Sequence, residues 1–330
     1  MRRREFLASV ATTLAPSVPS WAQDSRSTRR LGVLATVAAS DPEWQSEMGA
    51  LLHALAGYGW RDGANLQVEY RFGAGDPQRL SDGARDLANG NPNVLLARST
   101  IAVRALAAEA RALPIVFVSV ADPVAEGFAV SLARPGGNIT GFTQVEASMG
   151  GKWLELLKEV EPRVRRVGIL FNPQVAVERG AFFVRPMEAG AAALGIAVTS
   201  LPVHEVGDIE DTIASFSREP GAALVVPPDV FVVAHRAAII ATAARHRLPA
   251  VYAFRNMAIE GGLISYGVNV VDLYRRSAAY IDRIFRGEAA GNLPVQSPTT
   301  FELVINLMAA KGLGLVVPRE LLLRADEVIE

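Results

Sequence analysis

A repeated pattern of apolar segments constrains the fold of this 330-residue chain more than any other feature. Three segments of the first half recur in the second half, in the same order and at a nearly constant spacing. The matching pairs are 29–34 (RRLGVL) with 165–170 (RRVGIL), 94–96 (VLL) with 224–226 (LVV), and 113–117 (LPIVF) with 248–252 (LPAVY). Such self-similarity indicates two copies of one structural unit.

Each copy alternates strand-like and helix-like segments. The run Ile115–Val120 is unbroken and apolar, which is typical of a parallel strand covered on both faces. Asp122-Pro123 follows it, and because Asp caps helices and Pro favours their first turn, we expect a short helix there. Strands that alternate with helices predict a parallel sheet in each copy. The fold class is therefore α/β, with two Rossmann-like lobes.

Two glycine-led segments, Gly136–Gly141 and Gly261–Gly267, follow the last matched strand of each copy. If both are hinge strands, the chain leaves the first lobe near Phe142 and returns near Tyr266. We accordingly expect lobe 1 to comprise residues 29–143 and about 268–293. Lobe 2 would comprise residues 144–267 and about 294–330, although the pattern alone leaves the lobe of this tail open.

The N-terminus predicts export. Arg2–Leu7 contains Arg-Arg-x-Phe-Leu, and a mildly apolar stretch then leads to Ser20-Trp21-Ala22. This pattern is typical of a twin-arginine signal peptide over residues 1–22, with a small-x-Ala cleavage site. The alternative is a fortuitously basic N-terminus on a cytosolic protein. No later run approaches the roughly 20 apolar residues that a membrane span needs, so we expect a soluble periplasmic protein.

Composition excludes several classes of function. The formal net charge of -1 argues against a nucleic-acid surface. The absence of cysteine excludes thiolate catalysis, zinc–cysteine sites, iron–sulfur clusters, disulfides and a lipid-anchored cysteine. The four histidines lack metal-ligand spacing, there is no Gly-x-Ser-x-Gly segment, and Glu146–Trp153 departs from a phosphate-binding loop at both ends. We therefore predict no enzyme activity, no metal and no cofactor.

Polar residues recur where strands give way to helices, and these are the candidate ligand-binding residues. They are Ser40, Arg98, Ser99, Thr100, Ser119 and Asp122 in the first copy, and Asn172, Asp229 and Arg255 in the second. In a parallel sheet such turns lie at the carboxyl edge of the strands, so the two rows would form opposite walls of one cleft.

These residue types suit a small polar ligand. Amides at helix N-termini hold anionic groups, while the hydroxyls and Asp229 suit an amino group or a hydroxyl. Either Arg98 or Arg255 could pair with a ligand carboxylate, and the alternative is that these arginines are solvated. The alternative is that Ser, Asp and Asn here are ordinary helix caps, worth about 1 kcal/mol each, and Asp122 before Pro123 fits that description best.

Several segments resemble one known family. They are Asp122-Pro123-Val124 with Ser131–Gly141 (SLARPGGNITG), Gly261–Gly267 (GGLISYG), and Leu293–Gln296 (LPVQ) leading into Phe301–Asn306 (FELVIN). They are similar to the tryptophan/tyrosine-type periplasmic family of ABC-transporter substrate-binding proteins, over essentially the whole mature chain.

The resemblance implies a type I periplasmic-binding-protein fold, in which two lobes trap a ligand and deliver it to a membrane permease. It places Ser99, Thr100, Ser119, Asp122 and Asp229 at the binding turns. Where the family often has a small Gly-Thr-Pro-Ala-like turn, this chain has RSTIA over residues 98–102. That charged, bulkier turn argues against an aromatic amino acid.

Together these features predict the solute-binding component of an ABC importer, a periplasmic monomer that traps a small polar organic ligand such as an amino acid or a related acid. Its partners would be that ligand and the permease subunits of the inner membrane, with no nucleic acid. The first alternative is an extracytoplasmic receptor that reports its liganded state to a sensor kinase. The second is an exported enzyme on a doubly wound fold.

Overall fold

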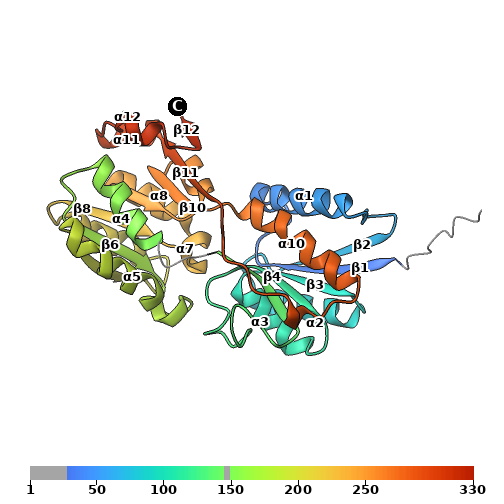
Figure 1. The fold of residues 1–330 in the computed structure, drawn as a ribbon. Coiled ribbons are helices and arrows are strands. Elements are labelled where there is room, and N and C mark those ends of the chain that lie inside the picture. The colour runs from blue at the N-terminus through green and yellow to red at the C-terminus, as the bar shows by residue number, and fades with distance from the viewer. Residues whose placement is uncertain (1–27, 145–148) are drawn as a thin grey trace, which may run out of the picture.

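Two β-sheets build two lobes in the computed structural model, which describes residues 28–144 and 149–330 (Figure 1). The predicted export signal, residues 1–22, lies outside the described residues. Within the described residues no helix is both long and apolar enough to cross a membrane. The predicted α/β class with two parallel-dominated sheets is confirmed.

The first lobe contains a five-stranded, fully parallel sheet with the order β2-β1-β3-β4-β5. Its strands are β1 (Arg29–Ala35), β2 (Leu66–Phe72), β3 (Val94–Arg98), β4 (Ile115–Val120) and β5 (Ile139–Thr143). All six residues of β4 are buried, as expected of a central strand covered by helices on both faces.

The second lobe repeats this topology. Its strands β7-β6-β8-β9-β10 follow the same order, and β11 then pairs antiparallel with β10 and parallel with β12. The strands are β6 (Arg166–Phe171), β7 (Ala197–Pro202), β8 (Ala222–Val226), β9 (Ala250–Tyr252), β10 (Ile264–Val268), β11 (Phe301–Asn306) and β12 (Glu327–Ile329). The matched sequence segments are therefore corresponding strands: β1 with β6, β3 with β8, and β4 with β9.

Helices cover both faces of the first sheet (Figure 1). They are α1 (Pro42–Gly57), α2 (Pro77–Asn89), α3 (Thr100–Glu109) and α10 (Val270–Phe285), with the short η3 (Ala290–Asn292) after α10. α1 packs on α10 over one face, and α2 packs on α3 over the other. Asp41 caps α1 by accepting hydrogen bonds from the N–H groups of Glu43 (2.9 Å) and Trp44 (3.1 Å).

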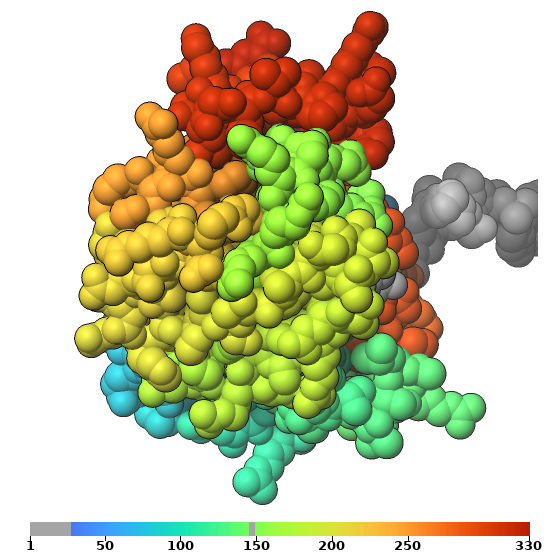
Figure 2. Space-filling view, turned by 90° about the vertical axis from the view of Figure 1, so that its left-hand side faces the viewer, coloured from blue at the N-terminus to red at the C-terminus, as the bar shows by residue number. Residues whose placement is uncertain are grey.

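The second sheet is covered in the same way. Its helices are α4 (Met149–Val160), η1 (Val177–Gly180), α5 (Ala181–Ala191), η2 (Ala192–Leu194), α6 (Asp208–Ser217), α7 (Val230–Ala234), α8 (Arg236–Arg245), α9 (Arg255–Ile259), α11 (Leu307–Leu313) and α12 (Arg319–Leu322). α4 packs on α5, and α6 packs on α8. Figure 2 views this lobe end on, with the C-terminal segment, coloured red, projecting beyond the rest.

The chain passes between the lobes three times. β5 belongs to the first sheet, whereas α4, which follows it, packs in the second lobe. β10 belongs to the second sheet, whereas α10 packs on α1. After α10 the chain lies beside β5, where Val295 N–H donates to the Leu132 carbonyl (2.7 Å) and Gln296 N–H to the Gly141 carbonyl (2.9 Å), before it enters β11.

A glycine lets each of the strands β5 and β10 approach its neighbour closely. A Cβ at Gly141 would lie 2.1 Å from the Phe117 carbonyl oxygen, and one at Gly267 would lie 1.7 Å from the Ala253 carbonyl oxygen. No side chain fits at either position without backbone movement. The glycine-led segments singled out in the sequence thus share one packing requirement.

The expected helix after Asp122-Pro123 is wrong, because the chain there forms turns rather than a helix. Asp122 accepts hydrogen bonds from the N–H groups of Val124 (3.0 Å) and Ala125 (2.9 Å), as a helix cap would. Gly127 then adopts a φ of 73°, and Phe128 N–H donates back to the Pro123 carbonyl (2.9 Å). The left-handed glycine ends the helical turn before a second one can form.

Candidate functional site

Two serines lie at the carboxyl ends of adjacent strands in the first lobe. Ser99 follows β3 and Ser119 lies near the end of β4, and these strands pair directly. Both serines have positive φ, 85° and 65°, which is uncommon for a residue with a side chain. Both hydroxyl oxygens are buried and have no hydrogen-bond partner in the described part of the chain. Backbone strain together with unsatisfied hydroxyls is typical of a ligand-binding site.

The N-terminus of α3 adjoins these two serines. Ser99 occupies its N-cap position but makes no side-chain capping bond, so the N–H groups of the first turn keep their hydrogen-bonding capacity. Thr100, the first residue of the helix, is half-buried. Free amide donors and the positive end of the helix dipole favour an anionic group at this place.

Asp229 is the corresponding feature of the second lobe. It follows β8 and is only 3% exposed, and one of its oxygens, Oδ1, caps α7 by accepting from Val232 N–H (3.1 Å). The other oxygen, Oδ2, is buried without a partner. Burial raises the pKa of Asp229 to about 6, although hydrogen bonds from backbone N–H groups oppose the shift. An uncompensated buried carboxylate is suited to receive a cationic group.

Asn256 joins Asp229 from the neighbouring turn. It lies in α9, just after β9, and β9 pairs with β8. Its side-chain oxygen is also buried without a partner among the described residues. Asn256 was not among the predicted ligand-binding residues, because the adjacent charge of Arg255 was the stronger signal. Asn256 follows β9, the repeat counterpart of β4, and this position would have indicated it as a candidate.

The elements that carry these residues lie on facing sides of the two lobes. In Figure 1, β1 runs from the outer edge of the first lobe toward the second, and α7 lies on the side of the second lobe that faces the first. Charges also interact across this boundary. Burial and the charge of Glu47 raise the pKa of Glu43 in α1 to about 7, while Arg98 and, from the second lobe, Arg236 oppose the shift. The carboxyl edges of both sheets therefore line one interlobe region.

Arg98 is neutralised within its own lobe. Its Nε and Nη2 atoms donate to the two carboxylate oxygens of Glu47, both at 2.9 Å, and Glu47 is fully buried. Burial by itself would lower the pKa of Arg98, but the charge of Glu47 outweighs it and holds this pKa above its ordinary value. A ligand carboxylate would have to compete with Glu47, so the geometry argues against Arg98 as its partner. Since Glu47 neutralises Arg98, the charged turn over residues 98–102 no longer argues against an aromatic ligand.

Arg255 is engaged as well. It forms an ion pair with Glu327 of β12 and lies 3.9 Å from Glu302 of β11. Its charge is thus compensated by the C-terminal strands of its own sheet.

The remaining predicted residues have local partners or are exposed. Asp122 caps a turn through two backbone N–H groups. The Asn172 side chain accepts from Gln174 N–H (2.8 Å) and donates to the His204 carbonyl (3.1 Å). Ser40 is exposed at the end of the first strand-to-helix turn. Among the predicted residues in the described part of the chain, buried side-chain atoms without a hydrogen-bond partner therefore belong to Ser99, Ser119, Asp229 and Arg255, whose Nε lies 3.9 Å from Glu302.

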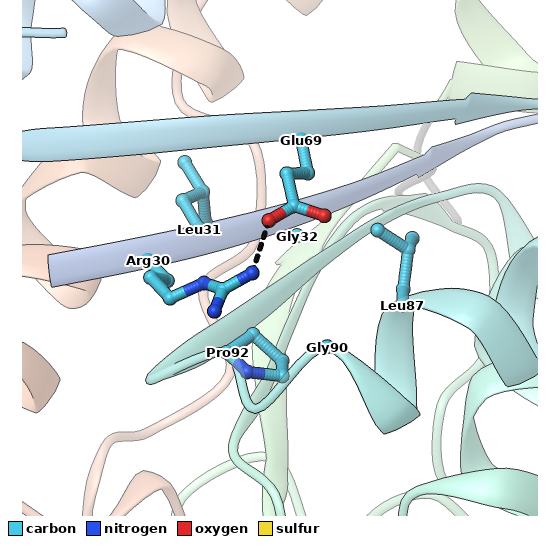
Figure 3. A pocket seen from close by; sticks show the side chains of 7 residues that line it. All are labelled: Arg30, Leu31, Gly32, Glu69, Leu87, Gly90 and Pro92. Carbon is cyan, nitrogen blue, oxygen red and sulfur yellow. Dashed lines mark hydrogen bonds and ion pairs between the residues drawn. The ribbon is translucent and has the colours of Figure 1, made fainter. Parts of the chain in front are cut away.

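A small cavity elsewhere does not contribute to this site (Figure 3). It measures about 10 Å³ and lies at the start of β1, the opposite end from the carboxyl edge. The ion pair of Arg30 and Glu69 spans it (Figure 3). Such a space holds about one water molecule and no organic ligand. Nor do the described residues contain a group of three or more His, Asp or Glu side chains placed to hold a metal.

Comparison with known proteins identifies the family of the chain. The family described as "ABC transporter substrate binding protein" matches residues 32–329. A tyrosine-binding protein from Clostridioides difficile (strain R20291) is 22% identical over 297 residues, which cover 88% of this chain and 83% of that protein.

Two solved structures share the fold. A conserved domain protein from Vibrio cholerae superimposes with a TM-score of 0.82 and 26% identity, over 91% of this chain and 99% of that one. An ABC domain from Streptococcus pneumoniae in complex with L-Trp superimposes with a TM-score of 0.83 and 23% identity, over 92% of this chain and 100% of that one. These matches confirm the resemblance noted in the sequence. The matched family is one of solute-binding proteins, not enzymes, and such proteins act outside the cytoplasm.

Proposed function

Because the chain belongs to the family of ABC transporter substrate-binding proteins, we propose that it captures a free amino acid between its lobes and delivers it to an ABC importer. One observation carries the choice of ligand. The unsatisfied hydroxyls of Ser99 and Ser119 in the first lobe suit an anion, and the unsatisfied oxygens of Asp229 and Asn256 in the second lobe suit a cation. An amino acid carries both charges on one carbon atom, so it matches both walls at once.

The carboxylate of the ligand would bind to the first lobe. The hydroxyls of Ser99 and Ser119 donate hydrogen bonds to it, together with the free N–H groups at the start of α3. A buried hydroxyl without a partner costs about 1–3 kcal/mol, and a bound carboxylate removes this cost at both serines. Hydrogen bonds to a charged acceptor are also stronger than neutral ones.

The ammonium group would bind to the second lobe. Asp229 Oδ2 supplies a negative charge and the Asn256 side chain supplies a second acceptor. Since a primary ammonium has three donors, it can satisfy both oxygens. Opposite charges from the ligand then bridge the two lobes, which favours the closed arrangement over the open one.

Tyrosine and tryptophan are the first ligands to test. The relative from Clostridioides difficile is named for binding tyrosine, and the structure from Streptococcus pneumoniae contains L-Trp. The ion pair with Glu47 turns the Arg98 side chain away, and this supports an uncharged side chain on the ligand.

We further propose that residues 1–22 direct export through the twin-arginine route, so that the mature protein acts as a periplasmic monomer. The three passages between the lobes would serve as the hinge. Its partners would be the permease subunits of an importer in the inner membrane.

Isothermal titration calorimetry of the mature chain, freed of bound ligand by unfolding and refolding, tests the proposal. We expect L-tyrosine or L-tryptophan to bind with a Kd in the micromolar range or below. Tyramine lacks the carboxylate and 3-(4-hydroxyphenyl)propionate lacks the amino group, so each should bind at least 30-fold more weakly than tyrosine. A folded, ligand-free protein that none of the twenty amino acids stabilises would refute the proposal. Tight binding without any defect in uptake by a deletion strain would instead favour the sensory receptor.

A further inference from the structure

A buried polar cluster lies directly behind the proposed carboxylate site. It consists of Glu47 in α1, Arg98 at the end of β3, and Tyr274 in α10. Arg98 donates two hydrogen bonds of 2.9 Å to Glu47, and the side chain of Glu47 is fully buried. The Tyr274 hydroxyl is buried beside this pair, and burial together with the charge of Glu47 raises its pKa well above the ordinary value, while Arg98 opposes the shift. The cluster thus joins three elements of the first lobe.

Arg98 immediately precedes the strained Ser99. Ser99 has φ 85° and ψ 162°, a conformation that persists only where the surrounding structure enforces it. On its C-terminal side, the Ser99 carbonyl accepts from Val103 N–H (3.1 Å) in α3. On its N-terminal side, the Ser99 N–H donates to the Val118 carbonyl (3.0 Å) of β4, and the preceding residue, Arg98, is held by its two-pronged side-chain contact with Glu47.

We propose that the Glu47–Arg98 pair is a positioning device, which holds Ser99 and the N-terminus of α3 in the orientation that receives the ligand carboxylate. This inference rests on the proposed function for the identity of the ligand. Arg98 acts through Ser99 and does not contact the ligand. A planar guanidinium fixed by two hydrogen bonds restrains its backbone in a way that a single ammonium contact does not.

A role of the Glu47–Arg98 pair in stability and a role in positioning Ser99 predict different effects when the pair is replaced. Replacing a buried ion pair by apolar side chains of similar volume is often neutral or stabilising. A pair that served stability alone would therefore be replaceable without loss of affinity. A pair that positions Ser99 would not, because apolar side chains lack the directional contact.

The central experiment compares E47L/R98M with a matched control, R283M/E288L. The control removes a bidentate pair with both contacts at 2.6 Å, which lies at the end of α10 and is more exposed. With L-tyrosine as the probe, we expect E47L/R98M to keep its melting temperature within a few degrees and to bind at least tenfold more weakly. The control should bind like the wild type. R98K, which keeps the charge but loses the two-pronged contact, should also bind more weakly.

A double-mutant cycle tests whether the pair acts through Ser99. S99G removes the hydroxyl and the backbone strain, because glycine adopts positive φ freely. If the pair works through Ser99, E47L/R98M should weaken binding clearly less in S99G than in the wild type, because the hydroxyl that it positions is already absent. A full additional tenfold loss would mean that the pair acts elsewhere, for example by contacting the ligand directly, and would overturn the inference.

Amide hydrogen exchange on the ligand-free protein gives a readout that does not depend on the ligand. The N–H groups of Ser99 and Val103 should exchange at least tenfold faster in E47L/R98M than in the wild type. Ala110 N–H, bonded to the Leu106 carbonyl (2.7 Å) at the other end of α3, should be unchanged. Wild-type protein that binds no amino acid would refute the proposed function alone. Unchanged exchange at Ser99 and Val103 would refute the positioning role, whatever the ligand.

Discussion

Replacing Asp229 with asparagine should strengthen the fold and weaken binding. Burial raises the pKa of this carboxyl from 3.8 to about 6. Because the pKa in the folded chain lies above its unfolded value, ionisation destabilises the fold increasingly as the pH rises from about 4 to about 6. A shift of about two units corresponds to about 3 kcal/mol above pH 6. Asparagine carries no charge and still caps α7, so D229N should be more stable at pH 7.5 by an amount of this order.

The same substitution should weaken binding sharply. Removing one partner of a buried charged contact costs about 2–5 kcal/mol, which is at least about a 30-fold increase in Kd. Urea unfolding of the ligand-free protein measures the first effect, and calorimetry with L-tyrosine measures the second.

Asp122→Asn is the matched control for this experiment. Asp122 also precedes a turn, but its contacts are hydrogen bonds from the N–H groups of Val124 and Ala125, which asparagine can accept as well. We expect D122N to change neither stability nor affinity appreciably. A D229N protein with wild-type affinity, or one less stable than the wild type, would refute our account of Asp229.

Three further outcomes are expected. The affinity for L-tyrosine should fall about tenfold per pH unit below pH 6, because the ligand ammonium requires ionised Asp229. Binding titrations from pH 5 to 8 should show that D229N abolishes this dependence and that E43Q keeps it. Ser119→Ala should bind about tenfold more weakly with little change in urea stability, since the buried hydroxyl has no partner among residues 28–144 and 149–330, and wild-type affinity would place the contact elsewhere. Gly141→Ala should lower the melting temperature drastically or prevent folding, because its Cβ would lie 2.1 Å from the Phe117 carbonyl oxygen. The control, Gly151→Ala in α4, has no neighbour within 4 Å of the added Cβ and should be neutral or stabilising. Similar effects of the two substitutions would contradict the packing argument.

Much of the fold could be predicted from the sequence, because the responsible signals are local. Buried parallel strands require unbroken apolar runs, and Ile115–Val120 is one of them. The repeat of these runs implied two similar lobes, and both sheets do share one strand order. Asp41-Pro42 and Asp76-Pro77 do start helices, since capping depends on a few neighbouring residues. The same rule failed at Asp122-Pro123, where Gly127 ends the turn.

The candidate site depended much less on local signals. Ser99, Ser119 and Asp229 could be selected because the carboxyl ends of parallel strands share one edge. Sequence alone could not separate a free group from a satisfied one. Arg98 resembled a partner for a ligand carboxylate until the fold placed Glu47, 51 residues away in sequence, against its guanidinium. Arg255 likewise finds its partner in Glu327, 72 residues away, through the C-terminal strands.

The sequence by itself thus determined the matched buried strands, that they occur in two copies, and which turns reach the carboxyl edges. Only the tertiary structure decided which of those polar groups remain unsatisfied. Within the described residues, a side-chain oxygen of each of Ser99, Ser119, Asp229 and Asn256 is buried without a hydrogen-bond partner, whereas the two arginines form ion pairs. The reason is physical: a hydrogen bond or an ion pair depends on distances of about 3 Å between residues far apart in the chain, and only packing sets those distances.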